Sequence, residues 1–479
     1  MNKTAPSPSS GSDAQAVVAE LMRRARSAQA IYETYTQEQV DEVVTAVAWA
    51  LVEPARNKAI SELAVRTTGL GNVADKITKN HRKTMGLLRD LKDAPSVGRI
   101  RDIPELGLVE IARPMGVVAA VVPSTNPAAT PVNKAINALK GRNAVILAPS
   151  PKGQDVCTRL LEFVHRELER IGAPLDLVQQ LPAPVSKAST QELMVQADLV
   201  VVTGSQNNVR RAYSSGGPAI GVGAGNVPVI IDACADLADA AAKIAISKTF
   251  DNATSCSSEN SLVIVDAVYD DAMAALASAG GILLTSAEKQ QLQNAMWQNG
   301  ALNRHVIAKS APEIADVVGL ERAELRSARF LMVEETGVGD QHPFSGEKLS
   351  PVLAIYRAAD FDAAFDRTRE ILDFQGKGHS CGIHTRNDDH IERLGLEMPV
   401  CRVIVNQAHA VGNGGSFDNG LPFSLSMGCG TWGKNSISDN LNYRHYMNIT
   451  RIARTIPPRE PSTEELFGHY WRKHGLAVS

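Results

Sequence analysis

The sequence predicts an α/β fold built on parallel sheets, and three observations support this. Strand-length apolar runs such as Val117–Val122 and Ala144–Ala148 alternate with segments of helical length. Turns rich in Pro, Ser and Gly follow these runs, as at Pro123–Pro127. The 479 residues suffice for two or three domains, each with its own core. Strands that alternate with helices form right-handed βαβ units, so we expect the strands to be parallel.

Composition and charge are those of an ordinary globular enzyme, with 44% hydrophobic and 21% charged residues. The 49 basic and 52 acidic residues leave a net charge of −3, so no nucleic-acid partner is expected. No apolar run approaches 18 residues, so no membrane partner is expected either. The 6 cysteines show no metal-ligand spacing, which favours reduced thiols, a cytoplasmic location and no metal site.

The first ninety residues are expected to be helical after a loose tail. Residues 1–14 contain the Ser/Pro/Gly segment Ser7–Ser12 and no apolar stretch typical of a signal peptide. From Gln15 to Leu91, apolar positions recur at helical spacing. Short strands are expected around Ile100, Ile103 and residues 108–111.

Beyond the first buried strand, helices and strands alternate regularly. Helices are predicted over 131–140, 154–171, around Glu192 and over 207–213, with strands at 144–148, 175–179 and 199–202. Such a sheet binds ligands at the carboxyl ends of its strands, where 123–126, 149–152 and 203–205 lie. A second unit starts near residue 229 or 232, with strands at 261–265, 352–356 and 402–406. The Gly-rich stretch 412–433 is predicted to be a functional loop.

Cys256 is the candidate nucleophile. Its thiol follows the small residues Ala253–Ser255, which suits a group that must reach a substrate. The usual thiol pKa of about 8.5 leaves only a few per cent of thiolate at neutral pH, so the site would have to activate it. The alternative is that Cys256 is a small buried apolar residue, as the other cysteines are expected to be.

Three further features have both a functional and an ordinary interpretation. Asn126, at a strand end, could donate to a developing oxyanion, or it could cap a helix or close a turn. Glu347 could accept bonds from ribose hydroxyls, or it could be a solvated loop residue. The glycines of Gly221–Asn226 do not open a helix after a buried strand, so they are not a dinucleotide fingerprint. The turn Thr203–Ser205, which leads into a helix, fits a phosphate better.

Taken in order, five motifs resemble the CoA-acylating branch of the aldehyde dehydrogenase superfamily over about residues 15 to 455: Ala112–Val118, Pro123–Pro127, Ala219–Asn226, Glu347–Pro351 and Leu425–Gly433. The resemblance implies a Rossmann-type cofactor domain, an α/β catalytic domain and a small oligomerisation arm. The implied boundaries are 15–231 for cofactor binding, with 97–114 contributing to the arm, 232–430 for catalysis, and 431–479 for a return segment and C-terminal oligomerisation element. A homodimer or homotetramer is expected.

The resemblance also implies roles for individual residues. Cys256 would be the nucleophile, and Asn126 would donate to the oxyanion together with the backbone N–H of Cys256. The nicotinamide cofactor would be held by nine residues: Pro123, Ser124, Ser150, Lys152, Gly204, Ser205, Gly223, Glu347 and Leu349.

Two departures from the hydrolytic members of the superfamily refine this expectation. Val222 stands where those enzymes carry the glutamate that activates water, so a CoA thiolate is expected to resolve the thioester instead. Pro151 stands where they carry a ribose-binding glutamate, and Lys152 follows it. The loss of that carboxylate favours NADP, with NAD possible as the alternative.

The substrate that the resemblance suggests is sulfoacetaldehyde, on the strength of Asn413–Phe417 and Tyr470–Arg472. Its sulfonate would be held by Arg210, beside Arg211, together with Asn413 and Ser416. Succinate semialdehyde and acetaldehyde are alternative substrates. The rival functions are a hydrolytic aldehyde dehydrogenase, an enzyme of the related glutamyl-phosphate reductase branch that uses an acyl phosphate, and a structural protein with an inert Cys256.

Overall fold

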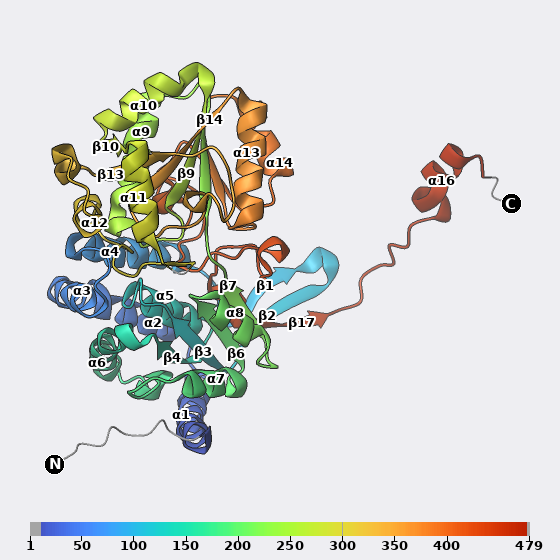
Figure 1. The fold of residues 1–479 in the computed structure, drawn as a ribbon. Helices are drawn as coiled ribbons and strands as arrows, with labels where there is room; N and C mark the ends of the chain where they lie inside the picture. The colour runs from blue at the N-terminus through green and yellow to red at the C-terminus, as the bar shows by residue number, and fades with distance from the viewer. Residues whose placement is uncertain (1–10, 299, 477–479) are drawn as a thin grey trace, which may run out of the picture.

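The computed structural model describes residues 11–298 and 300–476, and it has two stacked α/β units, a β-arm and a separate C-terminal helix (Figure 1). Of the tail expected over residues 1–14, residues 1–10 lie outside the described part. Residues 11–14 already belong to helix α1 (Gly11–Tyr32), in which Ala14 is buried, so the tail ends earlier than expected.

The predicted helical N-terminal region is confirmed. After α1 follow α2 (Gln37–Val52), α3 (Pro54–Thr68) and α4 (Val73–Leu91). Thr36 starts α2 with a reciprocal capping box to Gln39, and Gly69 ends α3 in a left-handed conformation that glycine adopts without strain. Helix α4 lies between the two units (Figure 1), where its buried face reaches the site described below.

The unit that lies lower in Figure 1, called the lower unit below, contains a parallel five-stranded sheet in the order β5-β4-β3-β6-β7. Its strands are β3 (Val117–Val122), β4 (Ala144–Pro149), β5 (Val178–Gln180), β6 (Leu199–Thr203) and β7 (Ala219–Val222). Helices α5 (Ala129–Lys140), α6 (Gln154–Arg170), α7 (Lys187–Gln196) and α8 (Gln206–Tyr213) connect them. Strands β3 and β4 are buried along their whole length, as expected for a sheet covered on both faces.

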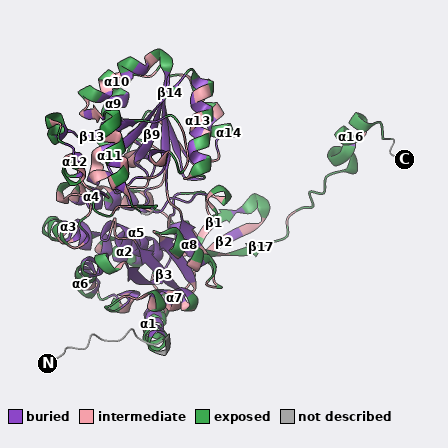
Figure 2. Ribbon diagram, viewed as in Figure 1, coloured by how far each residue is buried: buried purple, intermediate pink, exposed green. Residues whose placement is uncertain are grey.

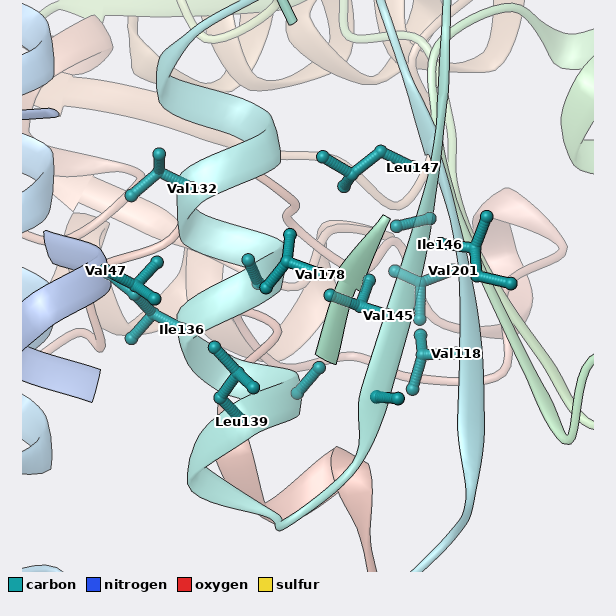
Figure 3. Packing of buried hydrophobic residues seen from close by; sticks show 14 of the residues in the cluster. Val47, Val118, Val132, Ile136, Leu139, Val145, Ile146, Leu147, Val178 and Val201 are labelled. Atoms are coloured by element: carbon teal, nitrogen blue, oxygen red, sulfur yellow. The ribbon is translucent and has the colours of Figure 1, made fainter. Parts of the chain in front are cut away.

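Helix α5 is packed between α2 and this sheet (Figure 3). Its side chains Ile136 and Leu139 belong to the same buried cluster as Val47 of α2 and Val145 of β4. Burial of aliphatic side chains of this size stabilises the fold by about 1.5–3 kcal/mol each. The packing fixes the carboxyl ends of β3 and β4, where the cofactor residues were predicted.

One predicted strand is shorter than expected. Residues 175–177 form a 3-10 turn after Pro174, whose carbonyl accepts a hydrogen bond from the Leu177 N–H at 3.3 Å. Only Val178–Gln180 pairs with β4. The apolar residues Leu175 and Leu177 suggested a strand, but the turn that follows the proline takes precedence.

The upper unit contains a parallel seven-stranded sheet in the order β10-β13-β14-β9-β8-β15-β16. Its strands are β8 (Val227–Ile231), β9 (Glu259–Val265), β10 (Gly281–Leu283), β13 (Phe330–Glu334), β14 (Val352–Ala358), β15 (Cys381–His384) and β16 (Val403–Val405). Its helices are α9 (Leu237–Thr249), α10 (Tyr269–Ser278), α11 (Ser286–Met296), α12 (Ala311–Val318), α13 (Phe361–Phe374), α14 (Asp388–Glu397) and the short α15 (His409–Gly412). A small hairpin joins β11 (Trp297–Gln298) to β12 (Ala301–Leu302).

The boundary expected between residues 231 and 232 does not separate the two sheets. Strand β8 precedes that boundary, yet it pairs with β9 and β15 inside the upper sheet. The change from one sheet to the other therefore falls in the glycine-rich segment 223–226, which connects β7 to β8.

The arm is an antiparallel sheet that joins two distant parts of the chain. Strands β1 (Gly98–Ile103) and β2 (Leu108–Pro114) pair with each other, and β17 (Met447–Ala453) pairs with β2 along its whole length. Beyond β17 the chain leads to α16 (Thr463–His474), which stands away from the body and is exposed (Figures 1 and 2). Within the described part of the chain, no helix has the length and apolar character needed to cross a membrane.

Candidate active site

Cys256 lies in the loop between α9 and β9, shortly after the 3-10 turn Phe250–Ala253. The preceding residues Asp251, Asn252 and Ala253 have φ values of 50°, 53° and 57°. A non-glycine residue in this region costs about 1–3 kcal/mol, and such strain persists only where surrounding contacts hold it. Asp251 supplies them: its buried carboxylate accepts hydrogen bonds from the Asn72 N–H at 3.0 Å and the Lys76 ammonium at 3.0 Å.

The half-buried thiol of Cys256 is packed against the segment that joins the two sheets. A Cβ atom on Gly225 would lie 2.1 Å from the Cys256 carbonyl oxygen, so only glycine fits there. Burial raises the pKa of the Cys256 thiol to about 12, and the negative charge of Glu347 acts in the same direction. The thiol is therefore protonated at neutral pH, and it needs a base to become a nucleophile.

His379 is the titratable side chain in contact with that thiol. Its Nε2 lies 3.4 Å from Cys256 Sγ, and its Nδ1 lies 2.8 Å from Ser380 Oγ. Burial, reinforced by the nearby charge of Arg402, lowers the pKa of His379 far below its usual value, so the imidazole is neutral. In the tautomer that carries its proton on Nδ1, the ring donates to Ser380 Oγ and Nε2 presents its lone pair to the thiol.

His379 is not among the candidate residues predicted from the sequence. A signal was present, because His379-Ser380 directly follows Gly376 and Gly378 and precedes strand β15. Both glycines have positive φ, 91° and 89°, and a Cβ on Gly378 would lie 2.0 Å from the Cys429 carbonyl oxygen. This tight turn places the His379 imidazole next to the Cys256 thiol.

Asn126, the predicted oxyanion donor, lies in the loop after β3. Its Oδ1 accepts a hydrogen bond from Lys79 at 2.9 Å, and the same ammonium contacts Thr254 Oγ1 at 3.1 Å. The structure thus links Asn126 to the loop that carries Cys256.

A cavity of about 870 Å³ opens at the carboxyl ends of β3, β4 and β6. Five of the predicted cofactor residues line it: Pro123, Ser124, Ser150, Gly204 and Ser205. Ser205 also caps α8, so the positive end of that helix faces the cavity. Ser150 Oγ is buried without a hydrogen-bond partner among the described residues, which fits a ligand hydroxyl at this wall.

The other four predicted cofactor residues are not on this wall. Lys152 is exposed on the neighbouring turn Pro151–Gly153, and Leu349 accepts a hydrogen bond from the Ala308 N–H through its carbonyl. Gly223 lies where a Cβ would be 3.0 Å from Gln206 Nε2. Glu347 lines a second cavity of about 440 Å³ beside Trp297 and Gln375.

Glu347 is also the acidic side chain whose charge acts on Cys256. Burial raises its pKa to about 8, although Lys348, Lys248 and a hydrogen bond from the Gly225 backbone favour its ionised form. At pH 7 this carboxyl is mostly protonated.

The three predicted substrate residues are split between two places. Asn413 donates to Ser257 Oγ at 2.9 Å, beside the nucleophile, and Ser416 accepts from Arg82 at 3.0 Å. Arg210 instead lines the 870 Å³ cavity. Arg210 thus comes from α8 of the lower unit, and a sulfonate site shared by all three residues stays a prediction.

The fold and the Cys256 site define an enzyme of the aldehyde dehydrogenase class. The family model "Aldehyde dehydrogenase family" matches residues 9–421, and the chain belongs to that family, which confirms the resemblance. It is 60% identical over 458 residues to "Sulfoacetaldehyde dehydrogenase (acylating)" of Cupriavidus necator, covering 96% of this chain and 93% of the relative. A Bilophila wadsworthia protein with the same description is 45% identical, covering 96% and 99%.

A solved structure leads to the same fold. The crystal structure of an acetylating aldehyde dehydrogenase from Geobacillus thermoglucosidasius superposes with a TM-score of 0.90 at 36% identity, covering 94% of this chain and 99% of that one.

Proposed function

We propose that this chain oxidises sulfoacetaldehyde to its CoA thioester with NADP, through a thioester on Cys256. His379 Nε2 takes the thiol proton, and Cys256 Sγ attacks the aldehyde carbon. The Asn126 amide and the Cys256 backbone N–H donate to the resulting oxyanion. The bound nicotinamide supplies the hydride acceptor. CoA then attacks the Cys256 thioester, and the acyl group leaves on the CoA sulfur while Cys256 is released.

The acylating assignment rests on Val222, which stands where the hydrolytic enzymes carry their water-activating glutamate. Val222 is buried and apolar at the end of β7, so it cannot take a proton from water. Glu347 is a carboxyl whose charge reaches Cys256, and its raised pKa keeps it mostly protonated at neutral pH. Water attack on the thioester therefore lacks the carboxylate base of the hydrolytic enzymes, whereas a CoA thiol brings its own nucleophilic thiolate.

The choice of aldehyde rests on the two acylating sulfoacetaldehyde dehydrogenases, which match nearly the whole chain. Arg82 brings a positive charge to the loop that carries Asn413, where it donates to Ser416 Oγ beside Asp418. An activity panel tests this proposal: sulfoacetaldehyde, succinate semialdehyde and acetaldehyde, each with and without CoA. We expect CoA-dependent turnover with the highest kcat/KM for sulfoacetaldehyde, and a clear preference for another aldehyde would contradict the substrate assignment.

We assign cofactor binding to the five-stranded sheet and catalysis to the seven-stranded one. NADP is favoured because Pro151 leaves no carboxylate on the cavity wall next to Ser150, while Lys187, Arg210 and Arg211 bring positive charge to it. Parallel binding titrations with NADPH and with NADH, each followed by the fluorescence of the reduced nicotinamide, measure the preference.

We further propose a homodimer or homotetramer in the cytoplasm. Strand β17 forms the outer edge of the arm, and α16 exposes Leu466, Phe467 and Tyr470, which favours contact with a second copy. All six cysteines are free, as suits a reducing compartment. Light scattering of the purified chain gives the oligomeric state.

A further inference from the structure

We propose that Lys79 is a positioning residue, whose ammonium orients the Asn126 amide so that Nδ2 faces the reacting carbonyl oxygen. The inference rests on the proposed function, because it assigns a partner to the oxyanion donor of that reaction. It concerns a lysine of the N-terminal helical region, far in sequence from Cys256.

The Lys79 ammonium has a partner for each of its three N–H groups. Nζ lies 2.9 Å from Asn126 Oδ1, 3.1 Å from Thr254 Oγ1 and 2.5 Å from Asp251 Oδ2. Its side chain is 6% exposed, and the Asp251 side chain is fully buried. These contacts join helix α4 to the loop after β3 and to the loop before Cys256.

The contact determines which end of the amide faces Lys79. An ammonium donates hydrogen bonds and accepts none, so only the amide oxygen can face it. If the Asn126 amide were flipped, its NH₂ group would be set against the buried ammonium and both donors would lose a partner. Nδ2 is therefore the end that remains for the substrate oxygen, as an oxyanion donor requires.

The charge balance keeps Lys79 in place. Burial by itself would raise the pKa of Asp251, but Lys79 and Lys76 bring the pKa below its usual value, so the carboxylate is ionised. Asp251 in turn holds both ammonium groups and Thr254 Oγ1. One buried carboxylate thus fixes the cation that orients Asn126 and the strained loop that presents Cys256.

Lys76 offers a matched control within the same network. It binds the same Asp251 oxygen at 3.0 Å and the backbone carbonyl of Thr125 at 3.3 Å. It lies one turn from Lys79 on α4 and carries the same charge, but within the described residues its ammonium does not bind the Asn126 amide. Lys76→Met therefore removes a buried positive charge without removing the contact that orients Asn126.

A double-mutant cycle on Lys79→Met and Asn126→Ala tests the proposal. The rate measured is that of the first burst of reduced cofactor with aldehyde and without CoA, which reports the acylation of Cys256. We expect Asn126→Ala to lose about 10²–10³-fold, the range for an oxyanion donor. Lys79→Met should lose at least tenfold, and the double variant should be no slower than Asn126→Ala alone, because Lys79 acts through that amide.

Losses that multiply in the double variant would overturn the proposal, since Lys79 would then act independently of Asn126. For Lys76→Met combined with Asn126→Ala, multiplication is the expected result. Cofactor affinity by fluorescence titration and thermal unfolding should differ little between Lys79→Met and Lys76→Met, which separates positioning from general loss of structure.

Lys79→Gln keeps the proposal testable if Lys79→Met does not fold. A glutamine amide can still donate to Asn126 Oδ1 but lacks the charge that Asp251 holds in place, so we expect Lys79→Gln to be slower than the parent, and the cycle can be run with it. A Lys79→Gln rate equal to that of the parent in a folded protein would show that the ammonium is not needed and would overturn the proposal. Full acylation in Asn126→Ala would instead refute the oxyanion role in the proposed function.

Discussion

Cys256 Sγ lies 3.4 Å from Nε2 of His379, a neutral and fully buried imidazole. This contact resolves a conflict within the site, because burial raises the pKa of the Cys256 thiol to about 12 and by itself would suppress the thiolate. A base in direct contact can take the proton as the carbon–sulfur bond forms, so the thiolate need not accumulate beforehand.

Replacing the base should slow acylation and change its dependence on pH. We expect His379→Ala to lose about 10²–10⁴-fold in burst rate at pH 7, the range for a general base. Since the Cys256 pKa is about 12, the remaining thiolate should rise about tenfold per pH unit below that value, and the variant's rate should rise with it. Burst rates between pH 7 and 10 measure this. His390, stacked on Phe361 and paired with Asp232, provides the control His390→Ala, which should retain the parent rate.

The nucleophile itself is tested by serine substitutions. Cys256→Ser should abolish turnover with little change in cofactor affinity, because a hydroxyl is a far weaker nucleophile than a thiol. Cys157→Ser, Cys234→Ser, Cys381→Ser and Cys401→Ser should keep most activity. Cys157 and Cys381 are buried, so their variants can lose stability without losing the reaction. Substantial activity in Cys256→Ser would refute the covalent mechanism.

The cofactor assignment is tested at Pro151 and Lys152. Pro151→Glu places a carboxylate on the wall of the 870 Å³ cavity, so it should raise the KM for NADP much more than that for NAD. Lys152→Ala should also weaken NADP more than NAD. Because Lys152 is exposed, its effect should shrink at high salt. Equal changes for both cofactors would leave Lys152 as a solvated surface residue.

The buried carboxylate of Asp251 should contribute strongly to stability. Asp251→Asn leaves Lys76 and Lys79 buried without a counter-charge, which should cost about 3–5 kcal/mol in the free energy of unfolding. In the parent, the folded-state pKa is lowered, so this contribution is present above the unfolded-state pKa near 4 and is lost as the pH falls through the folded-state value. Urea unfolding at pH 7 and pH 3 measures both effects. Asp239→Asn, which breaks an exposed pair with Lys243, is the control and should change stability far less.

The fold could be predicted from the sequence further than the site could. Strands β3, β4 and β6 are buried on both faces, so continuous apolar runs identify them without any knowledge of their neighbours. The same pattern overextended β5, because local turn geometry after Pro174 overrides apolar character. Five of the nine predicted cofactor residues line one cavity, since the strand ends of a parallel sheet meet at one edge.

The side chains that contact Cys256 and Asn126 could not be predicted from the sequence, for a physical reason. His379 is 123 residues from Cys256, and Lys79 is 47 residues from Asn126, so no local pattern links either pair. Lysines on an amphipathic helix usually face water, and only the folded chain shows that Lys79 is buried. Arg210 is a different case, because its charge suited a sulfonate while its position on α8 places it at the 870 Å³ cavity.

A rapid-mixing experiment with aldehyde and oxidised cofactor but no CoA tests the central claim most directly. The account predicts a single burst of reduced cofactor that then nearly stops, because Val222 cannot activate water and the Glu347 carboxyl is mostly protonated. Mass spectrometry of the quenched protein should place an acyl group on the peptide that contains Cys256, and addition of CoA should release it and restart turnover. Sustained formation of the free acid without CoA would contradict the acylating mechanism.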